Sequence, residues 1–382
     1  MDSSLPAASS RFSITEKSIP EISIIVPARN EETSLAACLE SLNTQTGVPF
    51  EIIVVDDAST DRTREIAQSC AGVRVISAGA LPQAGNTRGG NTSTGKNNAL
   101  IAGAKEAHAP WLLFTDADTV HRPHSLERAL AEAKKEQADL LSYSPEQIVV
   151  TFAERTVMPV IFAELAAQYP PQKVRDQNSN VIAANGQYIL VRRAAYDAVG
   201  GHAAIATEIL EDVALARQFR DASFKVHFRY GADAVRTRMY RNWPQLREGW
   251  TKNLALLFPR TGSLALRTLF FWAMAWVSLS LAAYGATSRR YLWIALALLW
   301  LLEYRRIRAA NFATLNYLLA IAMGLPIFAY LLLRSKRVHA SGRVSWKGRT
   351  YNTAAPREAT PAAGPAAKSI PGIEKHELSA EN

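Results

Sequence analysis

Two short apolar runs near the start of the chain flank a segment with helical periodicity. Residues 22–27 and 51–56 are almost continuously apolar, which is the pattern of strands that are buried on both faces. Between them, apolar side chains recur at the spacing of one helix face: Leu35, Cys38, Leu39 and Leu42. The order strand, helix, strand predicts a parallel βαβ unit with helices packed on its sheet.

The same alternation continues along the chain. It predicts a helix at 61–70, a strand at 73–77, a helix at 96–108 and a strand at 111–115. We therefore predict an α/β, Rossmann-like fold with a mostly parallel sheet and helices on both faces. In such sheets, ligands bind beyond the carboxyl ends of the strands. Three polar clusters follow predicted strands at that edge: 27–32, 56–59 and 116–118.

The last of these clusters contains two aspartates, Asp116 and Asp118, directly after an apolar strand. This spacing can bring two carboxylates to one hard divalent cation, such as Mg²⁺ or Mn²⁺ bound to a diphosphate. The other interpretation is an ordinary acidic turn after a strand. The neighbouring polar clusters favour the metal site.

The C-terminal part of the chain is apolar in long segments. Residues 263–284 and 312–333 are each 22 residues long, and a helix needs roughly 20 to cross a bilayer. Residues 291–304 make only 14, or about 21 Å as a helix, so this piece spans a thinned bilayer, re-enters it or lies at its interface. Aromatic side chains resemble interface anchors: Trp272, Trp276, Trp293, Trp300 and Tyr304. The alternative is a set of buried core helices.

Basic residues concentrate in the same region. Residues 260–350 carry 13 Lys or Arg and one acid, a surplus of twelve in a chain whose net charge is +9. The remainder is slightly acidic, so the excess predicts membrane-flanking residues and not a nucleic-acid-binding surface. The basic clusters 305–308 and 334–337 lie at opposite ends of the last apolar segment. Three simple spans cannot bring both to the cytoplasm, so one segment is re-entrant or the positive-inside rule fails once.

These patterns divide the chain into five parts. They are a flexible leader (1–20), a catalytic α/β domain (21–260), a membrane domain of two or three helices (261–336), a basic interfacial segment (337–351) and a disordered tail (352–382). The leader lacks the apolar core of a cleaved secretion signal. Cys38 and Cys70 lack metal-site or redox spacing, and they fit reduced thiols in a cytosol-facing domain.

Five motifs, taken in order, resemble those of inverting glycosyltransferases of family 2, which have the GT-A fold. They are Ile24-Ile-Val-Pro-Ala-Arg-Asn-Glu-Glu32, Val54-Val-Asp-Asp-Ala-Ser59, Gly95-Lys96, Asp116-Ala-Asp118 and Glu211-Asp212. The resemblance covers residues 20–260. The later segments 238–240, 248–252 and 346–351 resemble a membrane-bound subgroup that includes diaponeurosporenoate (carotenoid) and hopanoid-associated glycosyltransferases.

The resemblance implies a site for a nucleotide sugar. The residues implied to bind it are Pro27, Arg29, Glu31 and Asp57, with Asp56 as the alternate to Asp57, together with Lys96 and Asp116. A carboxylate accepts hydrogen bonds from the base and ribose, and a lysine that opens a helix suits a phosphate. An N-cap role is the alternative for Asp57. The polar loop 85–95 departs from the relatives, and it is not a Walker loop because no Ser or Thr follows Lys96.

The resemblance also implies metal-dependent catalysis. Asp118, with Asp116, is expected to hold Mg²⁺ or Mn²⁺ between the two phosphates, and a ribose contact is the alternative for Asp116. Asp212, with Glu211 beside it, matches the family's general base, which deprotonates the acceptor. Two alternatives stay open. Both acids could simply begin the helix 211–220, and an acceptor that is already an ionised carboxylic acid would leave Asp212 a positioning role.

Further residues are implied on the acceptor side: Asn185, Gly186, Gly201, His202, Trp250 and Lys252. His202 is expected to be a hydrogen-bonding lid residue and not a metal ligand. Gln245, Arg247 and Trp250 match the Gln-x-x-Arg-Trp motif of processive synthases imperfectly, because Gly249 stands where that motif has Arg. Transfer of one sugar to a lipid is therefore favoured over polymer synthesis.

The sequence thus predicts a multi-pass enzyme of the inner (plasma) membrane with a cytoplasmic catalytic domain. It is expected to transfer a hexose from a nucleotide sugar, with UDP-glucose as the favoured donor, to a lipidic acceptor such as a carotenoid or other isoprenoid lipid. A polysaccharide or polyprenyl-phosphate sugar synthase is the alternative enzyme. A non-catalytic membrane scaffold that keeps the sugar-nucleotide-binding fold is the alternative of another class.

Overall fold

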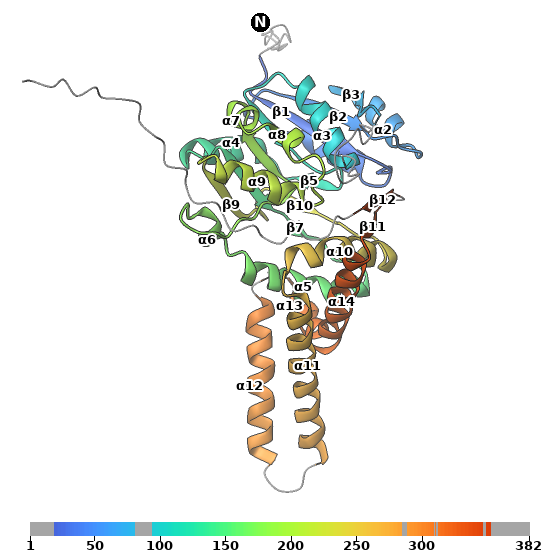
Figure 1. The fold of residues 1–382 in the computed structure, drawn as a ribbon, viewed down its shortest axis with the longest axis vertical. Helices are drawn as coiled ribbons and strands as arrows, with labels where there is room; N and C mark the ends of the chain where they lie inside the picture. Colours follow the sequence, from blue (N-terminus) through green and yellow to red (C-terminus); the bar gives the residue numbers. More distant parts are fainter. Residues whose placement is uncertain are drawn as a thin grey trace, which may run out of the picture.

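The computed structural model describes residues 19–80, 94–284, 289–308, 310, 312–346 and 349–352. The predicted leader lies almost wholly outside these residues, as do residues 85–93 of the polar loop and nearly all of the predicted tail. The chain forms an α/β domain from which two long helices extend (Figure 1).

A mixed seven-stranded sheet forms the centre of the α/β domain. Its strands are β1 (Ile22–Ala28), β2 (Phe50–Asp56), β3 (Val73–Ser77), β4 (Trp111–Phe114), β6 (Leu140–Ser144), β8 (Ile189–Arg192) and β9 (Val226–Tyr230). Their order is β3-β2-β1-β4-β8-β6-β9, and β8 is antiparallel to both of its neighbours. The other pairings are parallel, so the predicted fold class is confirmed.

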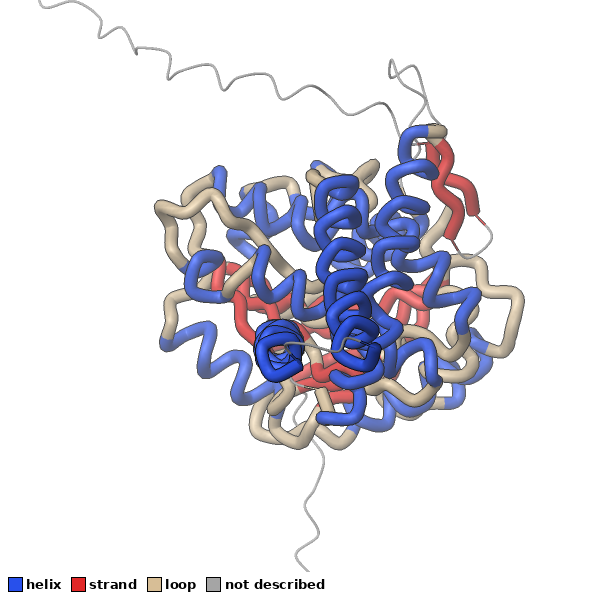
Figure 2. The backbone as a smooth tube through the Cα atoms, turned by 90° about the horizontal axis from the view of Figure 1, so that it is seen from below, coloured by secondary structure: helices blue, strands red, loops and turns tan. Residues whose placement is uncertain are grey.

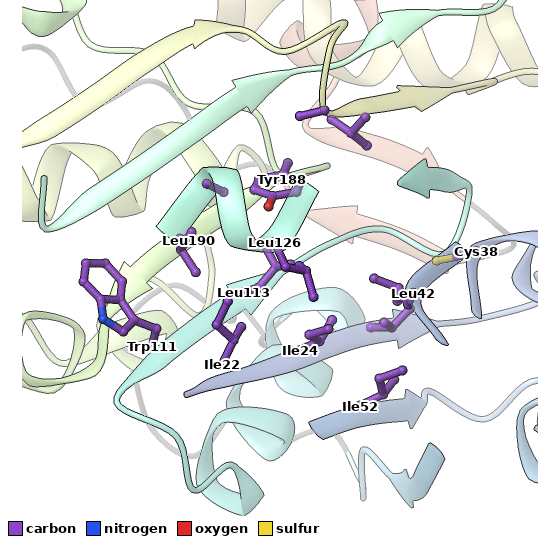
Figure 3. Packing of buried hydrophobic residues seen from close by; sticks show 14 of the residues in the cluster. Ile22, Ile24, Cys38, Leu42, Ile52, Trp111, Leu113, Leu126, Tyr188 and Leu190 are labelled. Carbon is purple, nitrogen blue, oxygen red and sulfur yellow. The ribbon is translucent and has the colours of Figure 1, made fainter. Parts of the chain in front are cut away.

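Helices cover both faces of the sheet because successive apolar residues of each strand point to opposite sides. On one face, Ile24 packs with α1 (Leu35–Asn43) and α4 (Ser125–Lys135). Figure 3 shows this cluster, in which Leu42 and Leu126 lie over the strands. On the other face, residues of α3 (Gly95–Glu106) and α9 (Glu211–Asp221) complete a second cluster. The helix α2 (Thr63–Ser69) connects β2 to β3 along the chain.

The order of the strands reverses at β1. The chain runs outward from β1 to β2 and β3 and then returns to β4 on the other side of β1. The carboxyl ends of β1, β2 and β4 therefore meet at a topological switch point, where open α/β sheets bind their ligands. A small sheet borders this edge, formed by β5 (Thr119–His121), β10 (Val235–Thr237) and β7 (Glu146–Gln147).

Two helices lie between the sheet and the two long helices (Figure 1). The helix α5 (Phe152–Gln168) begins at a capping box in which Thr151 and Glu154 bind each other's backbone N–H groups. The helix α10 (Trp243–Leu257) begins at Asn242, whose side chain accepts from the N–H of Gln245. Shorter helices connect the rest: α6 (Pro171–Arg175), α7 (Arg193–Ala198) and α8 (Gly201–Ala204).

The two extended helices are α11 (Thr261–Tyr284) and α12 (Arg289–Arg308), which lie side by side. In Figure 2, which views the molecule from below, they are seen nearly end-on in front of the α/β domain. Large apolar side chains along them are exposed, including Leu266, Phe270, Trp293 and Leu302. At their base, the buried Glu164 of α5 pairs with Arg267 of α11 and Arg306 of α12. This carboxylate therefore ties both helices to the α/β domain.

The last apolar segment behaves differently from the sequence expectation. It forms α13 (Thr314–Leu319), the π-helical turn η1 (Ala320–Gly324) and α14 (Leu325–Ala340). We expected 312–333 to span and 291–304 to be the irregular piece. In the structure, 291–304 lies within the continuous 20-residue helix α12, while more than half of the most apolar window within 314–340 is buried inside the protein. Two helical stretches are long and apolar enough to cross a membrane, 261–280 and 314–340.

The two basic clusters lie close to the α/β domain in the structure. Leu331 and Leu332 of α14 are fully buried in a cluster with α10, and the Ser335 hydroxyl donates to the carbonyl of Thr251. The basic end of α14 therefore lies on α10, while Arg306 at the end of α12 lies on α5. Both clusters thus lie on the side of the α/β domain. The predicted segment 337–351 completes α14 and forms the hairpin β11 (Arg343–Trp346) and β12 (Arg349–Asn352).

We expect Gly324→Ala to destabilise the protein by about 1–3 kcal/mol. A Cβ at Gly324 would lie 2.2 Å from the carbonyl oxygen of Thr156, so the backbones of η1 and α5 would have to separate. Thermal unfolding in detergent measures the effect. Gly262→Ala is the matched control, because its Cβ would meet only the flexible Lys336 Nζ at 3.3 Å. Equal melting temperatures for the two variants would contradict the close approach of η1 to α5 at Gly324.

Candidate active site

A cavity of about 600 Å³ opens at the switch point of the sheet. It brings together predicted residues from distant parts of the chain: Pro27, Arg29, Glu31, Asp57, Lys96, Asp116, Asp118, Asn185, Gly186, Glu211, Asp212, Trp250 and Lys252. The three aspartates on which the sequence interpretation depends, Asp57, Asp118 and Asp212, therefore share one cavity. Its size suits a ligand as large as a nucleotide sugar.

Three predicted residues do not line this cavity as the structure describes it: Asp56, Gly201 and His202. Asp56 accepts from the N–H of Ser59 at 3.1 Å and pairs with Arg64, so it stabilises a turn, and Asp57 is the residue that faces the cavity. His202 is 1% exposed and packs edge-on against Phe114. Its Nδ1 lies 3.0 Å from the Tyr196 hydroxyl.

His202 is therefore a packing residue, and the expected lid role is corrected. Burial lowers the pKa of His202 to about 3, so its ring is neutral at physiological pH. Gly201 belongs to the same packing, because a Cβ there would meet the Tyr196 ring at 2.3 Å. The Gly-Gly-His segment thus fixes α8 beside the sheet.

Lys96 lies at the centre of the acidic side of the cavity. Its Nζ is 2.8 Å from Asp116 Oδ1 and 2.6 Å from Glu211 Oε1. Burial alone would lower the pKa of Lys96, but Asp116 and Glu211 outweigh it and raise this pKa well above its usual value. Lys96 therefore stays protonated and joins the loop after β4 to the start of α9. The helix α3 positions it, since Thr94 caps that helix by accepting from the Asn97 N–H.

Asp212 is held by two backbone N–H groups. Its Oδ2 accepts from Gly186 at 2.9 Å and its Oδ1 from Val213 at 2.8 Å. Burial, and then the neighbouring Glu211, raise the pKa of Asp212 to about 6. Burial opposes the ionisation of Glu211, yet Lys96 and Lys252 lower its pKa to about 2. Two adjacent acids thus have well-separated pKa values, which is the pattern of an acid–base site.

An apolar wall completes the cavity on the side of the extended helices. It is formed by Phe162 and Leu165 of α5, Tyr169 directly after that helix, and Trp250 and Leu257 of α10. Sequence analysis found only Trp250 in this wall, because the helical spacing of α5 did not show which face would meet the cavity. Lys252 lies on the same helix, α10, and burial lowers the pKa of Lys252.

The structure explains why Gly249 replaces the arginine of the processive motif. A Cβ at Gly249 would lie 2.5 Å from both a ring carbon and the hydroxyl oxygen of Tyr240. Tyr240 is itself 3% exposed and lines the cavity. An arginine at this position is therefore excluded unless Tyr240 moves.

A buried polar network beneath the cavity was missed by sequence analysis. The Thr115 hydroxyl donates to the Gln187 carbonyl at 2.8 Å and lies 2.9 Å from the Thr119 hydroxyl. Thr119 donates to the Asp116 carbonyl, and Thr237 donates to the Asp118 carbonyl. The network therefore joins the Asp116–Asp118 loop to the 185–187 loop that holds Asp212. Thr115 and Thr119, which flank the two aspartates in the sequence, are the signal from which this network could have been predicted.

We expect Thr115→Val to cost about 1–3 kcal/mol of stability, because it leaves the buried Gln187 carbonyl without its donor. The variant should also raise the divalent-ion concentration needed for half-maximal activity several-fold. Chemical denaturation and a metal titration measure the two effects. Thr46→Val, at an exposed site, is the control. A stability loss with an unchanged metal titration would show that the network does not position the aspartates.

The residues present fit a divalent cation. Asp116 and Asp118 both line the cavity, and their carbonyl groups are bound from beneath by Thr119 and Thr237. Within the described residues, no group of three His, Cys, Asp or Glu is arranged to hold a metal. A protein that binds Mg²⁺ through one or two carboxylates relies on substrate phosphates and water for the remaining ligands. These two aspartates match that ligand set.

A switch-point cavity and two adjacent acids with separated pKa values are features of an enzyme site. Residues 23–200 match the model for glycosyl transferase family 2. The chain thus carries a family 2 domain and is a glycosyltransferase, as predicted.

Relatives of known name extend over most of the chain. The 4,4'-diaponeurosporenoate glycosyltransferase of Staphylococcus aureus is 28% identical over 341 residues, covering 87% of this chain and 88% of the relative. The enzyme of the same name from Staphylococcus haemolyticus is 29% identical over 353 residues, again covering 87% and 88%. The predicted resemblance to this subgroup is confirmed.

Solved structures of glycosyltransferases also align with the chain. Mannosyltransferase PcManGT from Pyrobaculum calidifontis, in complex with GDP-Man and Mn²⁺, aligns with a TM-score of 0.43 at 15% identity, covering 84% of this chain and 87% of that one. S. aureus TarS in complex with UDP-GlcNAc aligns with a TM-score of 0.39 at 17% identity, covering 87% and 97%.

Proposed function

We propose that this protein is an inverting, metal-dependent hexosyltransferase that transfers a sugar from a nucleotide donor, UDP-glucose in the favoured case, to a lipidic acceptor at a membrane. The acceptor class is a carotenoid or another isoprenoid lipid. The observation that carries this proposal is the single cavity that joins the acidic cluster around Lys96 to the apolar wall of α5 and α10. Such a cavity suits a polar donor at one end and an apolar acceptor at the other.

The donor is proposed to bind at the switch point. Asp57 and Glu31 lie on the nucleoside side, as acceptors for N–H and O–H groups of the base and ribose. Arg29 supports Asp57 by donating from its Nη1 to the Asp57 carbonyl at 2.8 Å. Asp116 and Asp118 would hold Mg²⁺ or Mn²⁺, which neutralises the leaving diphosphate as negative charge develops.

Asp212 is proposed to take the proton from the acceptor hydroxyl. The N–H groups of Gly186 and Val213 fix its two oxygens, and a pKa of about 6 leaves it mostly ionised at neutral pH. Lys96 keeps Glu211 ionised beside it. With an acceptor that is already a carboxylate, as the relatives' name indicates for them, Asp212 would orient the nucleophile instead.

The acceptor is proposed to approach from the side of α11 and α12. Exposed Leu266, Phe270 and Leu302 make these helices suited to a bilayer, and the wall formed by Phe162 and Trp250 faces the cavity above them. Basic residues at the ends of α12 and α14 on the α/β side agree with a cytoplasmic catalytic domain. We therefore propose a multi-pass protein of the plasma membrane.

Transfer of radiolabelled glucose from UDP-glucose to an apolar carotenoid acid or alcohol, by enzyme purified in detergent, tests this proposal. We expect an organic-extractable product that requires Mg²⁺ or Mn²⁺. We also expect Asp118→Asn to lower the rate by about 10²- to 10³-fold. Asp221→Asn, at the exposed end of α9, is the control. Label found only in a water-soluble polymer, or transfer that chelators leave unchanged, would contradict the proposal.

A further inference from the structure

A second cavity of about 600 Å³ lies at the base of the extended helices, where residues of α5, α6, β9 and α12 meet. Its floor is made of small residues, including Ala163 and Ala167 of α5. Four arginines line it: Arg175 of α6, Arg229 of β9, and Arg305 and Arg306 of α12. Ala166 and Tyr230 border both this cavity and the active-site cavity.

Two of the four arginines are neutralised by neighbouring acids. Arg229 pairs with Glu132 at 2.8 Å and with Asp233 at 2.6 Å. Arg306 pairs with Glu303 at 3.1 Å and also with Glu164. For the other two, Arg175 and Arg305, the described part of the chain provides no carboxylate within pairing distance. Two guanidinium groups therefore bring positive charge to a cavity whose floor leaves room for a ligand.

The cavity lies where α12 changes from apolar to basic. Trp293, Leu298 and Leu302 of α12 are about half or more exposed, and Arg305 follows within one helical turn of Leu302. If α11 and α12 cross a bilayer, as the proposed function holds, this end of α12 lies at the depth of the lipid head groups. A ligand there can place acyl chains along α12 and a charged group among the arginines.

We propose that this cavity binds the anionic head group of a membrane phospholipid, and the inference rests on the proposed membrane insertion. Guanidinium groups bind phosphate oxygens through paired N–H donors, which suits Arg175 and Arg305 converging from two elements. The bound lipid links α6 and α12 across α5. Because α5 also carries Phe162 and Leu165 of the acceptor wall, occupancy stabilises the wall along which the acceptor enters.

The test uses the full-length protein in nanodiscs of phosphatidylcholine with or without phosphatidylglycerol. Retention of a fluorescent phosphatidylglycerol is measured beside transferase activity. We expect Arg175→Gln/Arg305→Gln to weaken retention on the order of tenfold. Ala167→Phe should do the same without changing charge, because Ala167 lines this cavity and does not line the active-site cavity. Both variants should lose the stimulation of activity by phosphatidylglycerol.

Lys336→Gln/Arg337→Gln is the matched control, since it removes two exposed charges from the same side of the protein but outside the cavity. Equal loss of retention in this control would show general electrostatic attraction and overturn the proposal. Normal retention in Ala167→Phe would overturn it as well, as would displacement of the lipid by inorganic phosphate alone. Lipid retention is measured independently of catalysis, so an enzyme that retains lipid but transfers no sugar would refute only the proposed function.

Discussion

Asp212→Asn is expected to lower the turnover number for transfer to an alcohol acceptor by about 10²- to 10⁴-fold. The amide cannot accept the proton, but its oxygen can still accept from the Gly186 N–H that Asp212 binds at 2.9 Å. The loop 185–187 should therefore keep its place, and binding of the donor should change little. Steady-state kinetics with a nucleotide-binding assay separate the two quantities.

The pH dependence of the wild-type enzyme provides a second measurement of the same group. Burial and Glu211 raise the pKa of Asp212 to about 6, and the base acts only when ionised. Activity on an alcohol acceptor should therefore fall as pH drops through about 6 and level off above it. Asp212→Asn should remove this limb from the residual activity. A variant with an unchanged turnover number and a raised KM would show that Asp212 positions the acceptor and is not its base.

Lys96→Gln is expected to reduce transfer by about 10²- to 10³-fold, as loss of an electrostatic group in an enclosed site does. Lys96 bridges Asp116 at 2.8 Å and Glu211 at 2.6 Å, so its removal leaves two carboxylates facing each other without a cation. Lys96 also lowers the pKa of Asp212. The acid limb of the pH profile should therefore move to higher pH in the variant.

Lys105→Gln is the control for this experiment, since it removes the same charge from the exposed last turn of the same helix. Circular dichroism and thermal unfolding show whether each variant still folds. A folded Lys96→Gln variant with near-normal activity would mean that the Lys96 bridge is not needed for transfer. If activity falls but the pH profile does not move, Lys96 acts in donor binding and does not set the pKa of Asp212.

Local patterns were sufficient to predict the first half of the fold. The strand predicted at 73–77 is β3 as observed, and the helix predicted at 96–108 begins one residue earlier, at Gly95. The inner strands β1 and β4 could be predicted because a strand buried on both faces is apolar along most of its length, whatever it packs against. Asp57 and Asp118 could be placed at one edge for a related reason, since parallel strands bring their carboxyl ends together.

Features that depend on the identity of a neighbour could not be predicted from the sequence. The segment 312–333 is apolar enough to span a membrane, yet Phe328 and Leu332 are buried against the protein. Hydropathy cannot distinguish lipid from an apolar helix as the partner. The lid role expected for His202 was wrong for the same reason, because the sequence does not show that Tyr196 and Phe114 pack against this side chain.

The sequence by itself therefore determined the first four strands of the sheet, the acids that follow them and the family of the enzyme, because each depends on residue type and short spacing. Only the tertiary structure decided the rest. It brought Lys96 between Asp116 and Glu211, set Asp212 beside Gly186 and turned one face of α5 toward the cavity. These features join residues far apart in the chain, so they exist only once the chain has folded and excluded water from the site.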